Sequence, residues 1–201
     1  MPTLQLHQLR VAGVAKVIVN QFKDPIDKDS VLLACLFHDM GNIIKSDLSI
    51  FPEFLQPEGL EYWQGVKNEF LEKYGPDEHA ATITIAKEAG LPVAALHCIE
   101  RIGFSHATEN DQDNVMEYKV CNYVDMRVGP YGVLSMNDRI IEGQKRYAGK
   151  KHSIAGAKFD SLVQSLENIE KVIFGKTDLK PEDVNNEKVN NLIEELRKTE
   201  I

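Results

Sequence analysis

Residues 29–41 read DSVLLACLFHDMG, a run of seven apolar side chains that ends in an adjacent histidine and aspartate. A capping residue, Asp29 or Ser30, precedes the run and a glycine follows it, so the stretch predicts a helix over residues 31–39. Because this helix is apolar on all sides, we expect it to be central and buried. Its polar end is then unusual, since a buried carboxylate needs a cation or hydrogen-bond donors beside it.

Helical periodicity extends outward from this stretch through nearly the whole chain. Near the start, inward positions recur at alternate spacings of three and four, at Leu4, His7, Val11, Val14 and Ile18. Further helices are expected over residues 60–74, 78–89, 92–102, 114–128, 135–147, 154–174 and 181–198, with a loop that contains a short helix over 42–59 and a polar loop over 105–114. No segment shows the sustained alternation typical of β-strands. The sequence therefore predicts an all-α fold, with a main domain over residues 1–175 and a small C-terminal helical extension over residues 176–201.

The composition excludes some classes of partner. Acidic residues outnumber basic ones by 31 to 23 and the net charge is −8, which disfavours non-specific binding to nucleic acid or to an anionic membrane. No apolar run approaches the roughly 20 residues that cross a bilayer. The first ten residues lack the pattern of a secretory signal, and three cysteines without paired spacing do not suggest a disulfide framework. We therefore expect a cytoplasmic protein whose cysteines pack in the core.

Several polar residues fall at inward positions or at helix ends. His7 lies on the apolar face of the first expected helix, His38 and Asp39 end the most apolar one, and Asp125 shares a face with Cys121. Each residue alone is compatible with a hydrogen-bonded core position or a helix cap. Together they also match a metal site, since imidazole and carboxylate ligands suit Fe, Mn, Zn, Co or Ni.

Three segments carry a resemblance to a known family. LHQLRVAGVAKVI (6–18), ACLFHDMGN (34–42) and YVDMRVGPYGVLSMNDR (123–139) occur in the order typical of the HD-domain superfamily of metal-dependent phosphohydrolases. The resemblance covers about residues 4–148 and implies an HD-domain helical bundle. It assigns the metal ligands to His7, His38, Asp39 and Asp125, with Asp39 and His38 as the catalytic residues.

Two more histidines match places where dinuclear HD proteins hold a second ion. DEHAATIT contains His79 at the start of a helix, and IGFSHAT contains His106 after the following helix. The resemblance therefore implies one or two divalent ions, which the sequence does not distinguish among Fe, Mn, Zn, Co, Ni and Mg. A role for His106 in touching substrate stays open, whereas His97 and His152 match no ligand position.

The resemblance implies hydrolysis of a phosphomonoester, phosphodiester or pyrophosphate bond in a nucleotide or another small phosphorylated metabolite. Two alternatives stay open, namely a di-iron oxygenase on the same fold and a metal-binding regulatory domain without catalysis. Whether the chain forms a homo-oligomer is equally open.

Cationic side chains are the candidates for binding the substrate phosphate. The lysine often found just after the HD motif in related proteins is absent, but Lys45 lies close behind it. Arg139 and Arg146 lie seven residues apart on one expected helix face, near Glu142. They are candidate substrate ligands, with a surface ion-pair stripe as the alternative.

Overall fold

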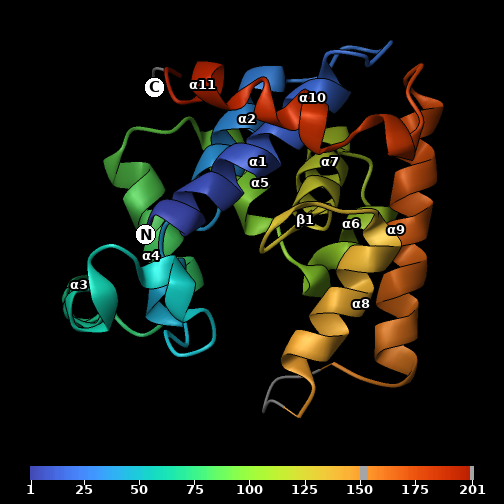
Figure 1. The fold of residues 1–201 in the computed structure, drawn as a ribbon. Coiled ribbons are helices and arrows are strands. Elements are labelled where there is room, and N and C mark those ends of the chain that lie inside the picture. Colours follow the sequence, from blue (N-terminus) through green and yellow to red (C-terminus); the bar gives the residue numbers. More distant parts are fainter. Residues whose placement is uncertain (150–153, 200–201) are drawn as a thin grey trace.

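The computed structural model describes residues 1–149 and 154–199 and shows an all-α protein (Figure 1), as the periodicity predicts. Its long helices are α1 (Pro2–Val19), α2 (Lys28–Phe37), α3 (Gly59–Tyr74), α4 (Glu78–Glu88), α5 (Val93–Glu100), α7 (Met116–Asp125), α8 (Met136–Tyr147) and α9 (Ala157–Gly175). Shorter turns are η1 (Asn42–Ile44), η2 (Pro52–Leu55), η3 (Phe104–His106), α6 (Ala107–Gln112), η4 (Pro181–Asp183), α10 (Asn186–Asn190) and α11 (Ile193–Leu196). The strands β1 (Val128–Gly129) and β2 (Gly132–Val133) form a minimal antiparallel hairpin.

Helix α1 lies at the centre of the molecule. It packs against α2, α7, α10, α11 and both strands, and Figure 1 shows it crossing the middle of the fold beneath the C-terminal helices. Its inward face supplies Val11, Val14 and Ile18, which are fully buried. The spacing of three and four residues explains this face, because such positions lie above one another on a helix.

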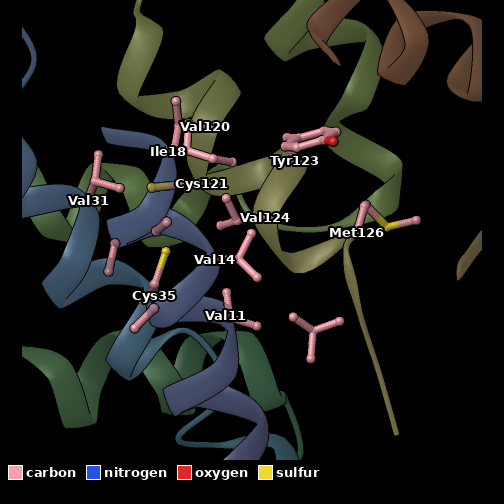
Figure 2. Packing of buried hydrophobic residues seen from close by; sticks show 14 of the residues in the cluster. Val11, Val14, Ile18, Val31, Cys35, Val120, Cys121, Tyr123, Val124 and Met126 are labelled. Atoms are coloured by element: carbon pink, nitrogen blue, oxygen red, sulfur yellow. The ribbon is translucent and has the colours of Figure 1, made fainter. Parts of the chain in front are cut away.

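The main core forms where α1, α2, α5 and α7 meet. Figure 2 shows Val14 of α1, Cys35 of α2 and Val124 of α7 pointing toward one another. Cys35, Cys98 and Cys121 are free and buried, as their apolar surroundings predict, and burial raises the pKa of the Cys121 thiol. Helix α2 is therefore central, because it contacts α1, α5 and α7 at once.

A second, smaller core lies beside the HD segment. It joins η1, η2, α3 and α4 around Ile44, Leu55 and Trp63, and the indole of Trp63 donates to the Leu55 carbonyl at 3.1 Å. This core holds the segment after Asp39 against the start of α4. It therefore fixes the chain that leaves the HD pair.

The C-terminal segment packs on α1 rather than standing apart. Val184, Val189 and Leu196 belong to the main core, and a Cβ added at Gly13 would lie 2.8 Å from Val189 Cγ1. The buried Arg127 guanidinium donates to main-chain carbonyls of Leu134, Pro181 and Val184 and to the Tyr123 hydroxyl, at 2.6–3.1 Å. Arg127 thus ties the end of α7 to both the hairpin and the C-terminal segment.

Three local expectations were wrong. The N-cap of α2 is Asp27, whose carboxylate accepts from the Ser30 amide at 3.1 Å, rather than Asp29 or Ser30. The expected loop over residues 105–114 contains helix α6, whose last carbonyls accept from the buried ammonium of Lys119. The expected helix over residues 181–198 is broken into η4, α10 and α11, because the Asn185 side chain caps a new helix inside it. In the ranges that the structure describes, no helix combines the length and apolar character of a membrane span.

Candidate metal centre

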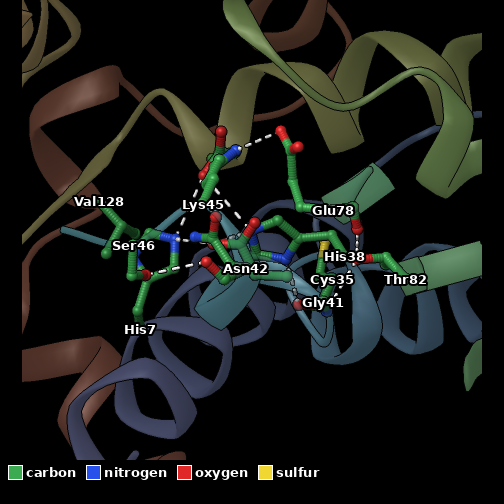
Figure 3. A network of polar contacts seen from close by, with 12 residues as sticks. His7, Cys35, His38, Gly41, Asn42, Lys45, Ser46, Glu78, Thr82 and Val128 are labelled. Atoms are coloured by element: carbon green, nitrogen blue, oxygen red, sulfur yellow. Dashed lines mark hydrogen bonds and ion pairs between the residues drawn. The ribbon is translucent and has the colours of Figure 1, made fainter. Parts of the chain in front are cut away.

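The first histidine of the centre comes from α1. His7 lies one turn before the fully buried Val11, and its side chain is 21% exposed. Its position on the apolar face directs the imidazole toward α2, where its ring centroid lies 5.4 Å from that of His38 (Figure 3). The pairing of α1 with α2 therefore brings together two histidines that are 31 positions apart in the sequence.

His38 is the most buried member of the centre. It is the C-cap of α2, and its Nδ1 lies 2.9 Å from the Cys35 carbonyl oxygen. A carbonyl only accepts, so Nδ1 carries the hydrogen of the neutral ring and Nε2 keeps its lone pair. Among the described residues Nε2 has no hydrogen-bond partner although its side chain is only 2% exposed. In the neutral form of the ring, this lone pair is available to bind a metal ion.

Two carboxylates face these imidazoles. Asp39 Oδ2 lies 3.7 Å from His7 Nε2 and 3.6 Å from His38 Nε2. Asp125 Oδ1, from the last residue of α7, lies 3.3 Å and 3.5 Å from the same two nitrogens. Two ligand atoms that each lie about 2.1 Å from a tetrahedral ion are roughly 3.4 Å apart, so each of these imidazole–carboxylate spacings is close to that of two ligands of one ion. His7, His38 and Asp39 form the three-residue cluster in the described part of the chain whose donor atoms all lie within 4.8 Å of one another.

The ionisable groups of the centre shift one another's pKa values. Burial alone would lower the pKa of His38, but Asp39 and Asp125 outweigh it and raise that pKa to about 9. Burial likewise tends to raise the pKa of Asp125, yet contacts with His38 and His7 bring it well below its ordinary value. The donor set therefore favours a positive charge at its middle, which a divalent cation supplies. The residues present fit such an ion.

The turn after Asp39 is pressed against α4. The Gly41 amide donates to Thr82 Oγ1 at 2.9 Å, and that hydroxyl donates to the Glu78 carbonyl at 2.9 Å. A Cβ at Gly41 would lie 2.4 Å from the same carbonyl oxygen, so only glycine fits this approach. The turn also contains Asn42, whose Nδ2 donates to Asp39 Oδ2 at 2.9 Å. The position of Asp39 is therefore set by contacts on both sides.

Lys45 lies beside the centre, as the sequence suggests. Its ammonium donates to Glu78 Oε1 at 3.1 Å, and its side chain is 52% exposed. Burial lowers the pKa of Lys45, but Asp39 and Glu78 raise it by more, and Tyr147 adds to the rise. Asp39 and the C-terminal end of α8 are thus both within electrostatic reach of this ammonium.

Arg139 and Arg146 share one carboxylate. Arg139 Nη1 lies 2.9 Å from Glu142 Oε2, and Arg146 Nε lies 2.8 Å from Glu142 Oε1. Arg139 Nε also donates to the Val128 carbonyl of β1 at 2.9 Å. The ion-pair arrangement considered from the sequence is therefore present, and a role of either arginine in substrate binding stays a prediction.

The two histidines expected at a second ion are not gathered into a cluster of three donors within the described ranges. His79 is exposed in the first turn of α4, and His106 is paired through Nδ1 with Glu109 Oε2 at 3.4 Å. The second ion therefore stays a prediction. His97 is exposed on α5, and His152 lies outside the described residues.

Sequence reasoning missed Asn42 and Thr82. Both act through hydrogen bonds to the HD turn, and neither lies on an apolar face that periodicity could mark. Asn42 is a polar residue directly after the His-Asp-Met-Gly run, and this position could have marked it as a candidate. The sequence does not show which atom its side chain contacts.

The fold is all-α, and it gathers His7, His38 and Asp39 into one cluster, with Asp125 facing both imidazoles. Residues 5–86 match the family model of the HD domain, which is the domain of the HD metal-dependent phosphohydrolase superfamily. The matched range contains His7, His38 and Asp39 but ends before Asp125. Searches of curated proteins and of solved structures found no match.

Proposed function

We propose that the protein is a metal-dependent phosphohydrolase that acts on a nucleotide or another small phosphorylated metabolite. The observation that carries the proposal is the convergence of His7, His38 and Asp39 inside an HD domain, with the buried Nε2 of His38 left without a hydrogen-bond partner among the described residues. Asp125 faces both imidazoles and completes the proposed ligand set.

Each group of the chain has a separate role in the proposed reaction. His7, His38, Asp39 and Asp125 would hold a divalent ion, which supplies a water of lowered pKa and positive charge for the phosphate when bound. The Cys35 carbonyl fixes the tautomer of His38, so that Nε2 is the free nitrogen. Asp39 would accept a hydrogen bond from the attacking water. Lys45 would bind phosphate oxygens as they gain charge, after exchanging Glu78 for the substrate.

Aromatic residues on the segments that follow the ligands support a nucleotide. Phe51 and Phe54, from the segment after Asp39, stack at 4.8 Å, and the Tyr131 ring of the hairpin meets the Phe54 ring edge-on at 5.6 Å. Tyr131 is 69% exposed. An exposed aromatic ring such as that of Tyr131 suits stacking with a base, which every nucleotide provides.

The test is phosphate release by protein stripped with a chelator and reloaded with Mn²⁺, Fe²⁺, Co²⁺, Ni²⁺, Zn²⁺ or Mg²⁺. We expect at least one loaded form to hydrolyse a member of a panel of nucleotides, sugar phosphates and phosphodiesters, also without oxygen. His38→Ala should abolish this release. Oxygen uptake with no phosphate release from any loaded form would overturn the proposal in favour of an oxygenase. Metal binding without either activity would favour a regulatory domain.

The number of ions is proposed separately. His79 and His106 are the candidate ligands of a second ion, with Asp39 shared between both. Metal titration of wild type and of His79→Ala measures this directly, since a dinuclear site should lose one equivalent in the variant. Equal stoichiometry in both proteins would contradict a role for His79.

A further inference from the structure

Asn42 is the residue after the HD turn whose side chain reaches back to a proposed metal ligand. Its Nδ2 donates to Asp39 Oδ2 at 2.9 Å. The same oxygen lies 3.7 Å from His7 Nε2 and 3.6 Å from His38 Nε2. The amide therefore contacts the Asp39 oxygen that faces the imidazoles.

The main chain of Asn42 is held on both sides. Its N–H donates to the Asp39 carbonyl at 3.0 Å, and its carbonyl accepts from Ser46 Oγ at 2.8 Å. Lys67, from α3, donates in turn to the Ser46 carbonyl at 2.7 Å. A side chain on so fixed a backbone holds its partner in place at a small cost in entropy.

The carbonyl oxygen of the Asn42 amide, Oδ1, is buried without a hydrogen-bond partner in the described residues. Leaving such a buried acceptor unpaired is costly, so a buried carbonyl oxygen beside a ligand set is a place for a polar group that enters with the ion or the substrate.

We propose that Asn42 is a positioning residue of the metal centre, which fixes Asp39 Oδ2 toward the two imidazoles through Nδ2 and accepts from an entering water or substrate hydroxyl through Oδ1. The inference rests on the metal centre of the proposed function, but not on which bond is hydrolysed. Each carboxylate oxygen has two lone pairs, so the amide uses one and leaves the other for the ion. Removing a hydrogen-bond partner of a ligand typically costs 10–100-fold in metal affinity.

The experiment compares two Asn42 variants with a matched control. Asn42→Leu keeps much of the volume and removes both polar ends, and Asn42→Ala covers the case in which leucine does not fit. The control is Asn110→Leu on α6, because Asn110 is buried, donates through Nδ2 to the Arg101 carbonyl at 2.8 Å and has an Oδ1 without a partner in the described chain. The control thus removes the same kind of hydrogen bond away from Asp39.

Three readouts are taken on the chelator-stripped full chain: Mn²⁺ affinity by calorimetry, the visible absorption spectrum of the Co²⁺ form, and the melting temperature without metal. We expect both Asn42 variants to raise the Kd for Mn²⁺ about 10–100-fold and to change the Co²⁺ bands. Asn110→Leu should lower the melting temperature and leave both metal readouts as in wild type.

An Mn²⁺ Kd within twofold of wild type, with an unchanged Co²⁺ spectrum, in either folded Asn42 variant would overturn the inference. A loss of affinity in Asn110→Leu equal to that in the Asn42 variants would do the same, since it would reflect general destabilisation. If the wild type binds Mn²⁺ but hydrolyses no phosphorylated compound, the proposed function fails while Asn42 is still tested. If it binds no divalent ion, both fall.

Discussion

Replacing Gly41 by alanine tests how the HD turn is positioned. The φ and ψ angles of Gly41 are −87° and −1°, which alanine also adopts, so backbone strain is not the issue. Space is the issue, because the added Cβ would lie 2.4 Å from the Glu78 carbonyl oxygen and 2.9 Å from both the Thr82 nitrogen and Ala81 Cβ. All three atoms belong to the backbone or Cβ of α4, so no side-chain rotation relieves the overlap.

The size of the effect follows from these contacts. A separation of about 3.0 Å, the closest that real Cβ atoms show, requires the turn and α4 to separate by at least about 0.6 Å. Overpacking of this kind costs about 1–3 kcal/mol. If the shift also breaks the buried hydrogen bond from the Gly41 amide to Thr82 Oγ1, about 1–3 kcal/mol is added. We expect the free energy of unfolding to fall by about 2–6 kcal/mol when both effects act.

The assay is equilibrium unfolding in urea of the chelator-stripped protein, together with Mn²⁺ calorimetry. Asp39 directly precedes Met40 and Gly41, so the same shift should weaken Mn²⁺ binding by about tenfold or more. Gly65→Ala is the control, because no atom lies within 4 Å of its added Cβ and Gly65 is an exposed position inside helix α3, where alanine should stabilise by about 0.5–1 kcal/mol. A Gly41→Ala protein with the wild-type midpoint and Mn²⁺ affinity would refute the reasoning.

Three further predictions concern the same fold. His38→Gln should abolish Mn²⁺ binding in calorimetry while the circular dichroism spectrum stays helical; wild-type affinity would remove His38 from the centre. Arg127→Met should lower the free energy of unfolding by about 3–5 kcal/mol, measured in urea, because it leaves buried carbonyls and the Tyr123 hydroxyl without their donor; a loss below 1 kcal/mol would contradict this. The raised pKa of His38 contributes stability that is complete below its ordinary value near 6.5 and is lost as the pH rises through about 9, so metal-free protein should lose about 3 kcal/mol between pH 6 and pH 10. The His38→Gln protein should not show this loss of unfolding free energy. Identical dependence of stability on pH in the two proteins would disprove the contribution of His38.

The helices could be predicted because their burial is periodic. Val11, Val14 and Ile18 mark one face of α1, and Asp77 marks the start of α4, whose amides at His79 and Ala80 it caps. Short helices escaped the same reasoning. Helix α6 buries only Ala107 and Asn110, so its formation depends on contacts with other elements rather than on a pattern within it.

The candidate site also contains residues that could be predicted from the sequence and contacts that could not. His7, His38 and Asp39 were predicted from inward position and family resemblance, and the structure gathers them within one ligand cluster. The polar contacts of the turn could not be predicted, because the sequence does not show that α4 returns to within contact of Gly41. That return depends on the small core around Trp63, which forms between segments about 20 residues apart.

An acidic chain can bind the proposed anionic substrate because the centre itself requires positive charge. The carboxylates of the centre are neutralised only when a proton or a cation is bound there. Asp39 and Asp125 face two imidazoles, and they raise the pKa of His38 to about 9 in the metal-free protein. A proton on His38 and a divalent ion therefore compete for Nε2, so metal affinity should rise with pH until that proton is gone. The net charge of −8 describes the whole chain, whereas the proposed phosphate substrate would meet the proposed ion and the ammonium of Lys45.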